Sequence, residues 1–591
     1  MKTKKKFKVI IQRKLLKFNL DKDNIFFILT LVVGVGAAFI AVSYAQIIDF
    51  ITHYLYPEHQ ISTQSIVIGA CMVFVSGYIT TRIESKTSGS GIPQTKIAYV
   101  AHHGVITFKT WFLKFISSVL SLGSGMSLGR EGPTVTTAAG LGSSLGGIFS
   151  LSKSQIKGLL AVGASGGIAA AFNTPIAAVL FTLEEIVGNM NTKSLGPIVI
   201  SSVIAAVSAR VMLGGESIFS GFHFRFEDPT ELPFYLIVGI LAAFLGPLWV
   251  KFIIRLRSFS LKILKGHKLT YMMLTFFVIV FVGSMFPEVF GGGHHVIQDA
   301  LQSKIFSLKT LALLFVLKFF FTSLCYSTGI SGGLFMPTLF LGAIIGSAVG
   351  VFAVELHPGI NTIGAFAMVG MGAFFISVIR APFTSIIMIF EMTQEYKIIL
   401  PLMIANITAF LISKKLMNGS IYEQIAIQDG VHLPSKEDFE ILDQLTVEDA
   451  MIRDVKTLNY NQSIREAMRA VNRSEISGYP VMKFGYISGV VSTNDLCQAY
   501  AKFQGECLLD QIATKELITI HPDQSLMYAF HLLKKHKVSR LLVTSRENDR
   551  RLVGIITAED IVNRFGFHIQ EESKAELIDQ FMEDKSPSAP I

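Results

Sequence analysis

The feature that most constrains this chain is a succession of apolar segments that runs from residue 25 to about residue 416. Several segments are too short for a bilayer, because a helix rising 1.5 Å per residue needs about 20 residues to cross the hydrocarbon. Glycine or proline interrupts the segments at 129–133, 173–175, 331–337 and 380–382. Breaks at membrane depth are tolerated only where they line a cavity or are covered by protein. The sequence therefore predicts an all-α polytopic membrane domain with broken helices over residues 25–426.

The breaks recur at a fixed interval. Three features of the first half return 207 residues later: Val162-Gly163, Pro175 and Glu184 recur as Val369-Gly370, Pro382 and Glu391. Pro133, Gly142 and Gly146 return as Pro337, Gly346 and Gly350, 204 residues later. Duplicated halves with broken helices are typical of transporters whose site lies between the repeats, and this architecture favours inverted repeats. Because Glu184 and Glu391 correspond, we interpret both as structural helix-end residues.

Gly129-Arg130-Glu131-Gly132-Pro133 begins one of the predicted helices. A helix start presents unpaired N–H groups and the positive end of the helix dipole, which together form a site for an anion. Glu131 can occupy that site as a tethered anion, and protonation would let it leave. The alternative is a structural helix start in which Arg130 and Glu131 pair locally. A bilayer favours the functional hypothesis, since burying an ionisable group there is costly.

The residues before and after the apolar part are polar. Residues 1–24 are basic, and we interpret them as a cytoplasmic segment on the membrane surface. The net charge of +9 is carried mainly outside the apolar part. We therefore attribute it to membrane orientation rather than to nucleic-acid binding. Composition agrees, because 51% of residues are hydrophobic and only 16% are charged. Residues 427–444 are predicted to be a linker, and 568–591 an acidic tail.

A second duplication follows the linker, with a repeat of 62 residues. Its repeated positions are Thr457, Gln462-Ser463 and Ala467, matched by Thr519, Gln524-Ser525 and Ala529. Each unit ends on a short apolar strand and a turn, at Ser492-Thr493-Asn494-Asp495 and Thr557-Ala558-Glu559-Asp560. Alternating amphipathic helices and short β-branched strands predict a tandem α/β module over 445–503 and 504–567.

Three motifs resemble the hallmarks of the CLC family of chloride channels and proton-coupled chloride transporters. They are Gly89-Ser90-Gly91-Ile92-Pro93, Gly129-Arg130-Glu131-Gly132-Pro133 and Gly333-Leu334-Phe335-Met336-Pro337, in the order the family has them. The resemblance covers roughly residues 25–426 and implies a homodimer with one anion pathway in each subunit. Residues 445–567 resemble a tandem pair of CBS domains, as many CLC proteins carry.

The resemblance also implies roles for individual residues. The hydroxyls of Ser90 and Tyr422 and the backbone amides of Leu334 and Phe335 would hold chloride, since neutral donors bind the ion without trapping it. Glu131 resembles the gating glutamate, and Glu185 the internal proton-transfer glutamate. Lys114 matches a buried lysine that makes the pore more positive, and we group Arg130 with it. In isolation, Ser90 would be read as a helix cap and Tyr422 as an interfacial residue.

For the CBS pair, the resemblance implies an adenine nucleotide as ligand. Asp495 and Asp560 would take ribose hydroxyls, and Thr457, Ser492, Thr519 and Thr557 would contact phosphates or ribose. The alternative is a dimerisation module without a ligand. No other cofactor is required.

Three functions compete. The carboxylate at Glu185 favours a Cl⁻/H⁺ exchanger over a gated chloride channel, since channels of the family usually lack it. A membrane-anchored nucleotide sensor is the third. An enzyme is disfavoured, because the chain lacks a Gly-x-x-x-x-Gly-Lys-Ser/Thr loop. The four cysteines show no metal spacing.

We expect chloride, protons, lipid and a second copy as partners, no nucleic acid, and a multi-pass location in the plasma (inner) membrane with the N-terminus and CBS pair cytoplasmic.

Overall fold

The computed structural model describes residues 21–57, 61–189, 194–214, 229–263, 266–304, 307–357, 363–431, 445–471, 478–503, 506–536 and 538–564. The chain divides into a helical unit, residues 1–433, and a C-terminal unit, residues 434–591. The predicted N-terminal segment lies outside the described residues except for 21–24. Most of the predicted linker and the whole predicted tail also lie outside them.

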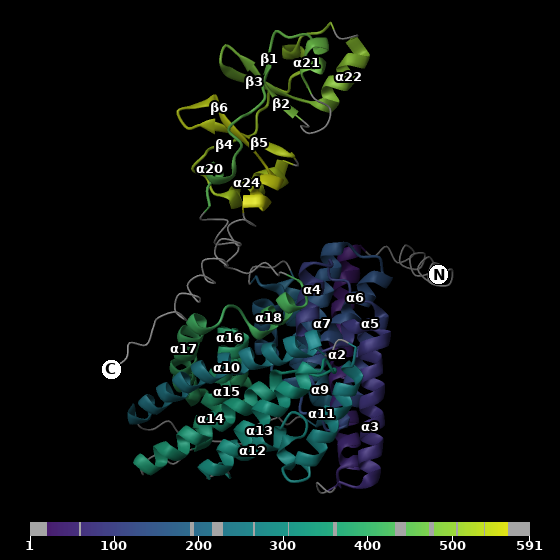
Figure 1. Cartoon of the computed structure of the whole chain (residues 1–591), viewed down its shortest axis with the longest axis vertical. Helices are drawn as coiled ribbons and strands as arrows, with labels where there is room; N and C mark the ends of the chain where they lie inside the picture. The colour runs from purple at the N-terminus through teal and green to yellow at the C-terminus, as the bar shows by residue number, and fades with distance from the viewer. Residues whose placement is uncertain are drawn as a thin grey trace, which may run out of the picture. The chain divides into compact units, whose positions relative to one another are not determined.

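The helical unit is built from α-helices of very different lengths (Figure 1). Its α-helices are α2 (Lys22–Leu55), α3 (Thr63–Tyr78), α4 (Ile92–Val100), α5 (Phe108–Gly123), α6 (Glu131–Ile148), α7 (Lys153–Phe172), α8 (Pro175–Phe181), α9 (Leu195–Leu213), α10 (Leu232–Ile263), α11 (Lys268–Gly283), α12 (His294–Leu301), α13 (Leu308–Ser327), α14 (Phe335–Leu356), α15 (Ile363–Ile379), α16 (Pro382–Thr393), α17 (Ile399–Leu416) and α18 (Ile421–Gln428). Short π- and 3₁₀-helical turns join or extend them: η2 (Ile79–Ile83), η3 (Ser85–Thr87), η4 (Thr182–Val187), η5 (Pro229–Glu231), η6 (Pro287–Val289) and η7 (Tyr396–Ile398).

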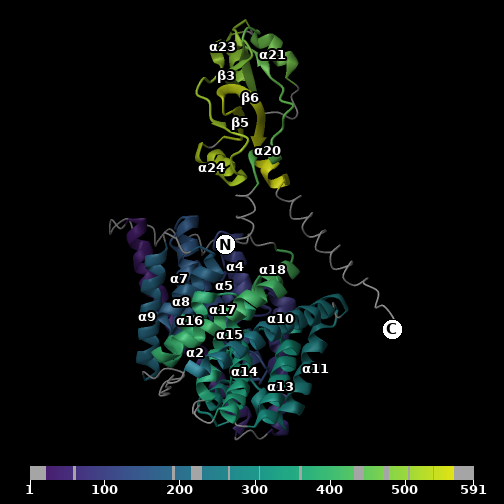
Figure 2. The same cartoon turned by 90° about the vertical axis from the view of Figure 1, so that its left-hand side faces the viewer.

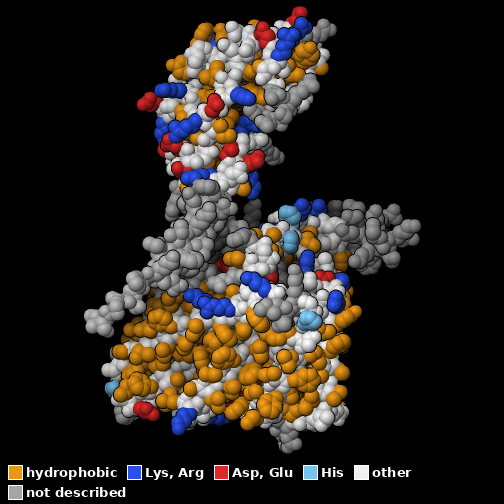
Figure 3. Space-filling model, in the orientation of Figure 1, with side chains coloured by type: hydrophobic (Ala, Val, Ile, Leu, Met, Phe, Trp, Pro, Cys, Tyr) orange, Lys and Arg blue, Asp and Glu red, His pale blue; other side chains and the backbone are white. Residues whose placement is uncertain are grey.

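Within the described residues, eight helices are long and apolar enough to cross a membrane, while α4, α8 and α12 are too short. Each short helix begins after a glycine or at a proline, and the start of α8 at Pro175 coincides with the break predicted at 173–175. Hydrophobic side chains cover the flank of the helical unit in a broad belt, and Lys and Arg gather along one rim of it (Figure 3). The exposed hydrophobic side chains of the unit include Phe39, Val211 and Phe281. The expected polytopic membrane fold with broken helices is confirmed.

The duplication is visible in the packing. Helix α6 packs on α7 in the first half, and α14 packs on α15 in the second (Figures 1 and 2). Both pairs approach through glycine at corresponding positions. A Cβ on Gly163 would lie 2.2 Å from the carbonyl oxygen of Ala138, and one on Gly370 would lie 2.2 Å from that of Gly342. Only glycine permits such close backbone approach, which explains why the Val-Gly pairs recur.

The two halves cap each other's broken helices. The carboxylate of Glu391, on α16, accepts hydrogen bonds from the amides of Ile176 (3.0 Å) and Ala177 (2.7 Å) at the start of α8. Reciprocally, the carboxylate of Glu184 accepts from the amides of Phe383 (3.2 Å) and Thr384 (2.9 Å) at the start of α16. Such an exchange is what a two-fold axis between duplicated halves produces. The structural helix-end role assigned to both glutamates agrees with this geometry.

The described residues of the C-terminal unit form two three-stranded sheets of identical order. Its elements are α20 (Val447–Ala450), β1 (Leu458–Asn459), α21 (Ile464–Ala470), β2 (Gly478–Lys483), β3 (Tyr486–Ser492), α22 (Thr493–Phe503), α23 (Leu509–Ile512), β4 (Thr519–Ile520), α24 (Leu526–His536), β5 (Arg540–Ser545) and β6 (Asn548–Thr557). In the first sheet β1 is parallel and β3 antiparallel to the central β2, and β4, β5 and β6 repeat this arrangement. The predicted tandem α/β module is confirmed.

The two repeats of this unit are interleaved. Ile452, ahead of the first sheet, bridges to Ile555 on β6, whereas Thr514, ahead of the second, bridges to Val490 on β3. Apolar residues of both repeats, including Ile487 and Leu542, share one buried cluster. Each repeat therefore completes the sheet of the other, and the unit is a single module.

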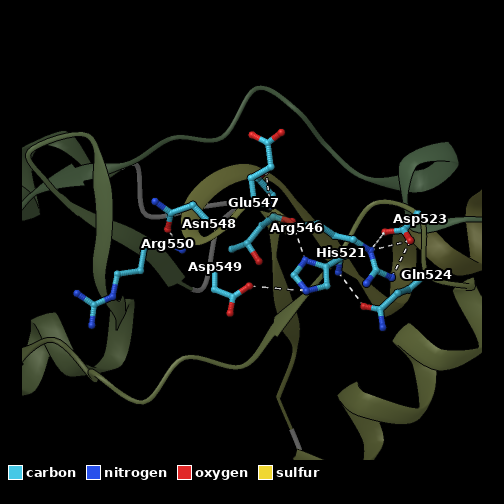
Figure 4. Close-up of polar contacts among 10 residues, drawn as sticks. His521, Asp523, Gln524, Arg546, Glu547, Asn548, Asp549 and Arg550 are labelled. Atoms are coloured by element: carbon cyan, nitrogen blue, oxygen red, sulfur yellow. Dashed lines mark hydrogen bonds and ion pairs between the residues drawn. The ribbon is translucent and has the colours of Figure 1, made fainter.

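An ion pair fastens the β5–β6 turn of the second repeat (Figure 4). Arg546 donates from Nε to both carboxylate oxygens of Asp523, each at 2.9 Å, and Nη2 lies 2.7 Å from Oδ2. This bonding lowers the pKa of Asp523 below its ordinary value. His521, beside it, shares a hydrogen bond of 3.0 Å between Nδ1 and the carbonyl oxygen of Thr544. Both partners of the ion pair are exposed, so we expect a small contribution to stability.

The reciprocal caps generate a stability prediction. Glu184→Ala and Glu391→Ala each leave one exposed and one partly buried amide without an acceptor, which should cost about 1–3 kcal/mol in each case. We expect similar decreases in apparent Tm for the two variants in detergent. Glu355→Ala, which removes an exposed carboxylate at the end of α14, is the matched control. A decrease for only one of the two cap variants would contradict the equivalence of the halves.

Candidate functional site

Three glycine-rich loops meet at the centre of the helical unit. Gly129 and Gly333 form a two-way bridge, in which the Gly129 amide donates to the Gly333 carbonyl at 2.8 Å and the reverse bond is 2.6 Å. The Gly89 loop joins them, since the amide of Gly332 donates to the carbonyl of Gly89 at 3.1 Å. The three motifs, which are far apart in the sequence, therefore form one hydrogen-bonded core.

Ser90 sits against the first turn of α6. A Cβ on Gly132 would lie 2.4 Å from Ser90 Oγ and 2.7 Å from the Ser90 carbonyl oxygen. The Ser90 hydroxyl also lies near that of Tyr422. Both side chains are fully buried, and neither hydroxyl makes a hydrogen bond of standard geometry with the described residues. Buried polar atoms without partners are rare, and here two of them face the same place.

Helices α6 and α14 both begin at this place. Phe335 is the first residue of α14, and Leu334 is its N-cap. Amides at a helix start have no acceptor within the helix, so they are free to bind an anion. The Phe335 ring packs on Phe172, Phe181 and Phe375, which fixes the orientation of this helix start. The structure thus brings together the four predicted chloride-binding residues Ser90, Leu334, Phe335 and Tyr422.

Glu131 points into the protein. Its side chain is 4% exposed, and Oε2 is buried without a hydrogen-bond partner among the described residues. A Cβ on Gly129 would lie 2.4 Å from this oxygen and 3.3 Å from the amide nitrogen of Met336. The carboxylate therefore lies beside the first turn of α14, as a tethered anion requires. Arg130 Nη1 lies 3.5 Å from Asp49 Oδ1, and its charge also acts on Glu131.

Lys114 holds the loop that carries Ser90 through two hydrogen bonds. Its buried ammonium donates to the carbonyls of Thr87 (2.9 Å) and Gly89 (2.5 Å). Lys318, 204 residues later, does the same for another loop, by donating to Val289 (3.3 Å) and Gly291 (2.6 Å). Each lysine adds positive charge near the helix starts and also fixes a loop. The 204-residue interval could have identified Lys318 from the sequence, but the sequence analysis missed it.

Glu185 belongs to a buried charge cluster at the end of η4. Lys96 Nζ lies 3.0 Å from Glu185 Oε1 and 2.9 Å from Glu423 Oε1. Ser420 Oγ also donates to Glu185 Oε1, at 3.3 Å. Tyr422 lies within electrostatic reach of both Glu185 and Glu131. The sequence analysis missed Lys96 and Glu423, although each lies within six residues of a residue that it selected.

Two cavities of the helical unit are lined by residues close in sequence to this site. One, of about 690 Å³, is lined by Ser88 and Gln94 and by the cations Arg82, Lys86, Arg257 and Lys268, and we call it the Arg257 cavity. The other, of about 830 Å³, is lined by Leu128, Arg130 and His294, and we call it the His294 cavity. Residues next to Ser90 line the first, whereas residues next to Glu131 line the second. The site therefore lies between two cavities, as a transport pathway requires.

In the C-terminal unit, the two predicted ribose-binding aspartates occupy equivalent helix starts. Asp495 Oδ2 accepts from the amide (3.0 Å) and hydroxyl (2.6 Å) of Ser492. Asp560 Oδ2 accepts from the amide (2.8 Å) and hydroxyl (2.6 Å) of Thr557. Both Ser492 and Thr557 are thereby engaged in caps. Among the described residues no hydrogen bond ends on either Oδ1, so each aspartate keeps one acceptor for a ligand.

Thr457 and Thr519 lie at the starts of the two parallel strand pairs. Thr457 is exposed and precedes β1, and Thr519 is the first residue of β4. The burial of Arg540, at the start of β5 near Asp560, lowers the pKa of its guanidinium. Arg540 also donates to the Gly478 carbonyl of the other repeat at 2.9 Å. Within the described residues there is no group of three His, Cys, Asp or Glu side chains that could hold a metal.

Comparison with known proteins gives a consistent result. The family model described as voltage gated chloride channel matches residues 71–414, and the CBS domain model matches residues 447–502 and 509–566. A relative from Vibrio cholerae, named H(+)/Cl(-) exchange transporter ClcA, is 31% identical over 447 residues, covering 72% of this chain and 95% of the relative. One from Vibrio campbellii with the same name is 33% identical over 372 residues, covering 61% and 78%.

Solved structures agree. A slow cyanobacterial Cl⁻/H⁺ antiporter superposes with a TM-score of 0.65 at 26% identity, covering 69% of this chain and 98% of its own. A eukaryotic CLC transporter covers 90% of this chain and 97% of its own, with a TM-score of 0.63. Its identity is 19%, so this second likeness concerns the fold alone.

The contact between Gly132 and Ser90 generates a prediction. In Gly132→Ala, the new Cβ would collide with both the hydroxyl and the backbone carbonyl of Ser90, so we expect anion flux to fall at least tenfold. Gly147→Ala, on the same helix α6, is the control, because nothing lies within 4 Å of a Cβ there. That variant should stabilise the helix by up to about 1 kcal/mol without changing flux. Equal anion flux in both variants would show that Ser90 does not line the anion path.

Proposed function

Because the chain belongs to the voltage-gated chloride channel family, the CLC family, and carries two CBS domains, we propose that it exchanges chloride for protons across a membrane. The observation that carries the proposal is the place of Glu131. This buried carboxylate lies at the meeting point of two helix starts, beside two buried hydroxyls that have no hydrogen-bond partner among the described residues. The names of the relatives support proton coupling.

Chloride would bind where the hydroxyls of Ser90 and Tyr422 face the first amides of α14. These donors are neutral, so they replace the ion's hydration without holding it as tightly as a buried cation would. Lys114 and Lys318 raise the local potential, yet their ammonium groups are bonded to backbone carbonyls and so do not grip the ion directly. The cations lining the Arg257 cavity would attract anions toward Ser90.

Protons need a different set of groups. Glu131 would compete with chloride as an anion and leave the path when it takes a proton. Glu185 would deliver or receive the proton on the side of the Arg257 cavity, and Tyr422 lies within electrostatic reach of both glutamates. Lys96 and Ser420 position the Glu185 carboxyl, because both contact its Oε1. Two titratable carboxyls on either side of one anion site favour exchange over a passive channel, which needs no second carboxyl.

The functional unit is proposed to be a homodimer in the plasma (inner) membrane, with the N-terminus and the CBS pair in the cytoplasm. On α17, Leu400, Met403, Ile407 and Leu411 form an exposed apolar stripe at helical spacing, which a second copy would cover in the proposed dimer. On α9, Val199, Val203, Val207 and Val211 form another.

One experiment tests the exchange itself. Purified protein in liposomes would be given a chloride gradient, and proton movement against its own gradient would be recorded. Uphill proton movement is expected for an exchanger. Chloride flux without protons would instead support a channel, and no flux of either would support a nucleotide sensor.

Variants of the two glutamates test the mechanism. Glu131→Ala should keep chloride flux and abolish proton coupling, since the competing anion is gone. Glu185→Gln should stop proton movement while chloride still passes. Glu184→Gln, at the neighbouring position, is the matched control. The glutamine keeps an acceptor oxygen for the amides at the start of α16, so this variant should couple protons to chloride as the wild type does. If Glu185→Gln still coupled protons fully to chloride, Glu185 would not be part of the proton path.

The CBS pair is proposed to bind an adenine nucleotide through the free Oδ1 atoms of Asp495 and Asp560. If binding affects transport, the nucleotide must bind two transporter states with different affinity. Asp560→Asn should weaken binding of ATP to the full-length protein roughly tenfold or more, which is the loss of about one charge-assisted hydrogen bond. Asp523→Asn, an exposed aspartate of the same unit, should bind as the wild type does. Calorimetry that detects no binding of ATP, ADP or AMP to the wild type would favour a dimerisation module.

A further inference from the structure

His294 is a titratable side chain that lies close to Glu131 and lines the His294 cavity. Its Nε2 lies 3.9 Å from Glu131 Oε1. The imidazole is 29% exposed, whereas the carboxylate is 4% exposed. His294 therefore lies between a carboxylate that solvent hardly reaches and a cavity of about 830 Å³.

The loop that presents this side chain is fixed in place. Lys318 donates to the carbonyls of Val289 and Gly291, which precede α12. Gly293 then takes a φ of +83°, and a Cβ there would lie 2.4 Å from the Phe340 ring. Only glycine suits both conditions. The fold therefore fixes the position of His294, the first residue of α12. A side chain that transfers protons in every transport cycle needs such a fixed position.

Charged groups surround the imidazole on several elements. Arg130 and Glu131 face it from the start of α6, Lys318 from α13, and His295 from its own helix. Asp49 and His53 on α2, Glu288 on η6 and Asp299 on α12 line the same cavity. Asp49 partly offsets the charge of Arg130, since the two groups lie 3.5 Å apart.

We propose that His294 relays protons between the His294 cavity and Glu131, an inference that rests on the proposed exchange. The Nε2–H bond of a protonated imidazole breaks, its proton forms an O–H bond at Glu131 Oε1, and the electron pair stays on Nε2. Water in the cavity then returns a proton to the neutral ring. The reverse steps release a proton to the cavity, so the balance holds in both directions of transport.

The distance of 3.9 Å fits such a step only if the carboxylate moves, because proton transfer needs about 2.6–3.2 Å between heavy atoms. A shift of Glu131 toward the cavity by about 1 Å closes the gap. That is the direction in which the side chain must move to vacate the anion site. One movement therefore opens the path to chloride and brings the carboxylate to its proton donor.

The test measures coupled turnover as chloride efflux from liposomes, with the membrane potential clamped and pH equal on both sides. Under these conditions every chloride cycle requires a proton, so slower proton transfer slows efflux. His294→Ala should slow efflux about tenfold or more, since general acid–base groups contribute at least that much to proton transfer. Imidazole added to both sides should restore much of the rate, because the vacated space opens to the cavity. His295→Ala, at the next position of α12, is the control, and should be neither slowed nor rescued.

A structural role for His294 predicts a different pattern. A loop that had merely lost its shape would not recover with imidazole. In the Glu131→Ala background, adding His294→Ala should have no further effect on chloride flux, because the relay acts through Glu131 alone. His294→Asn, which preserves size, should be slow as well.

The inference is overturned if His294→Ala and His294→Asn both turn over at the wild-type rate, or if imidazole fails to accelerate the alanine variant. It is also overturned if the effect persists without Glu131. Wild-type protein that moves chloride without protons would instead overturn the proposed exchange, together with the relay that depends on it.

Discussion

The pair of hydrogen bonds between Gly129 and Gly333 organises the helical unit. It holds the first turns of α6 and α14 side by side, so that two sets of unpaired amides face one volume. The Ser90 loop joins the same core through the Gly89 carbonyl, and Lys114 fixes that loop. The proposed anion site of neutral donors would follow from this arrangement, and the position of residue 131 at the start of α6 is what would let its carboxylate compete for that site.

Much of this could be predicted from the sequence, because the information was local or repeated. The interval of 207 residues marked Glu184 and Glu391 as equivalent helix-end groups, and each does bond to a helix start. The loops at Ser90, Glu131 and Leu334 have glycine and proline at fixed places, so the sequence predicted a sharp backbone turn followed by a helix start in each loop. Short apolar segments with breaks indicated helices that stop inside the membrane.

Other contacts were beyond the sequence because they join residues with no common pattern. Lys96 bonds to Glu185 and Glu423, which lie 89 and 327 residues away. His294 approaches Glu131 only because Lys318 and Phe340 shape its loop. The engagement of Ser492 and Thr557 in caps, by contrast, was local, because each has an aspartate three residues later, which is the spacing of a capping box. Tertiary structure decides the contacts of Lys96 and His294.

The exchange of caps between α8 and α16 has a consequence for how the protein is made. While the chain emerges, the first half enters the bilayer with the leading amides of α8 lacking their acceptor and the carboxylate of Glu184 lacking its donors. Neither requirement is met until α16 has been synthesised, about 200 residues later. The first half therefore cannot complete its hydrogen bonding on its own. A ribosome that stalled between the halves would leave an intermediate with unsatisfied polar groups in the membrane, which quality-control proteases could recognise.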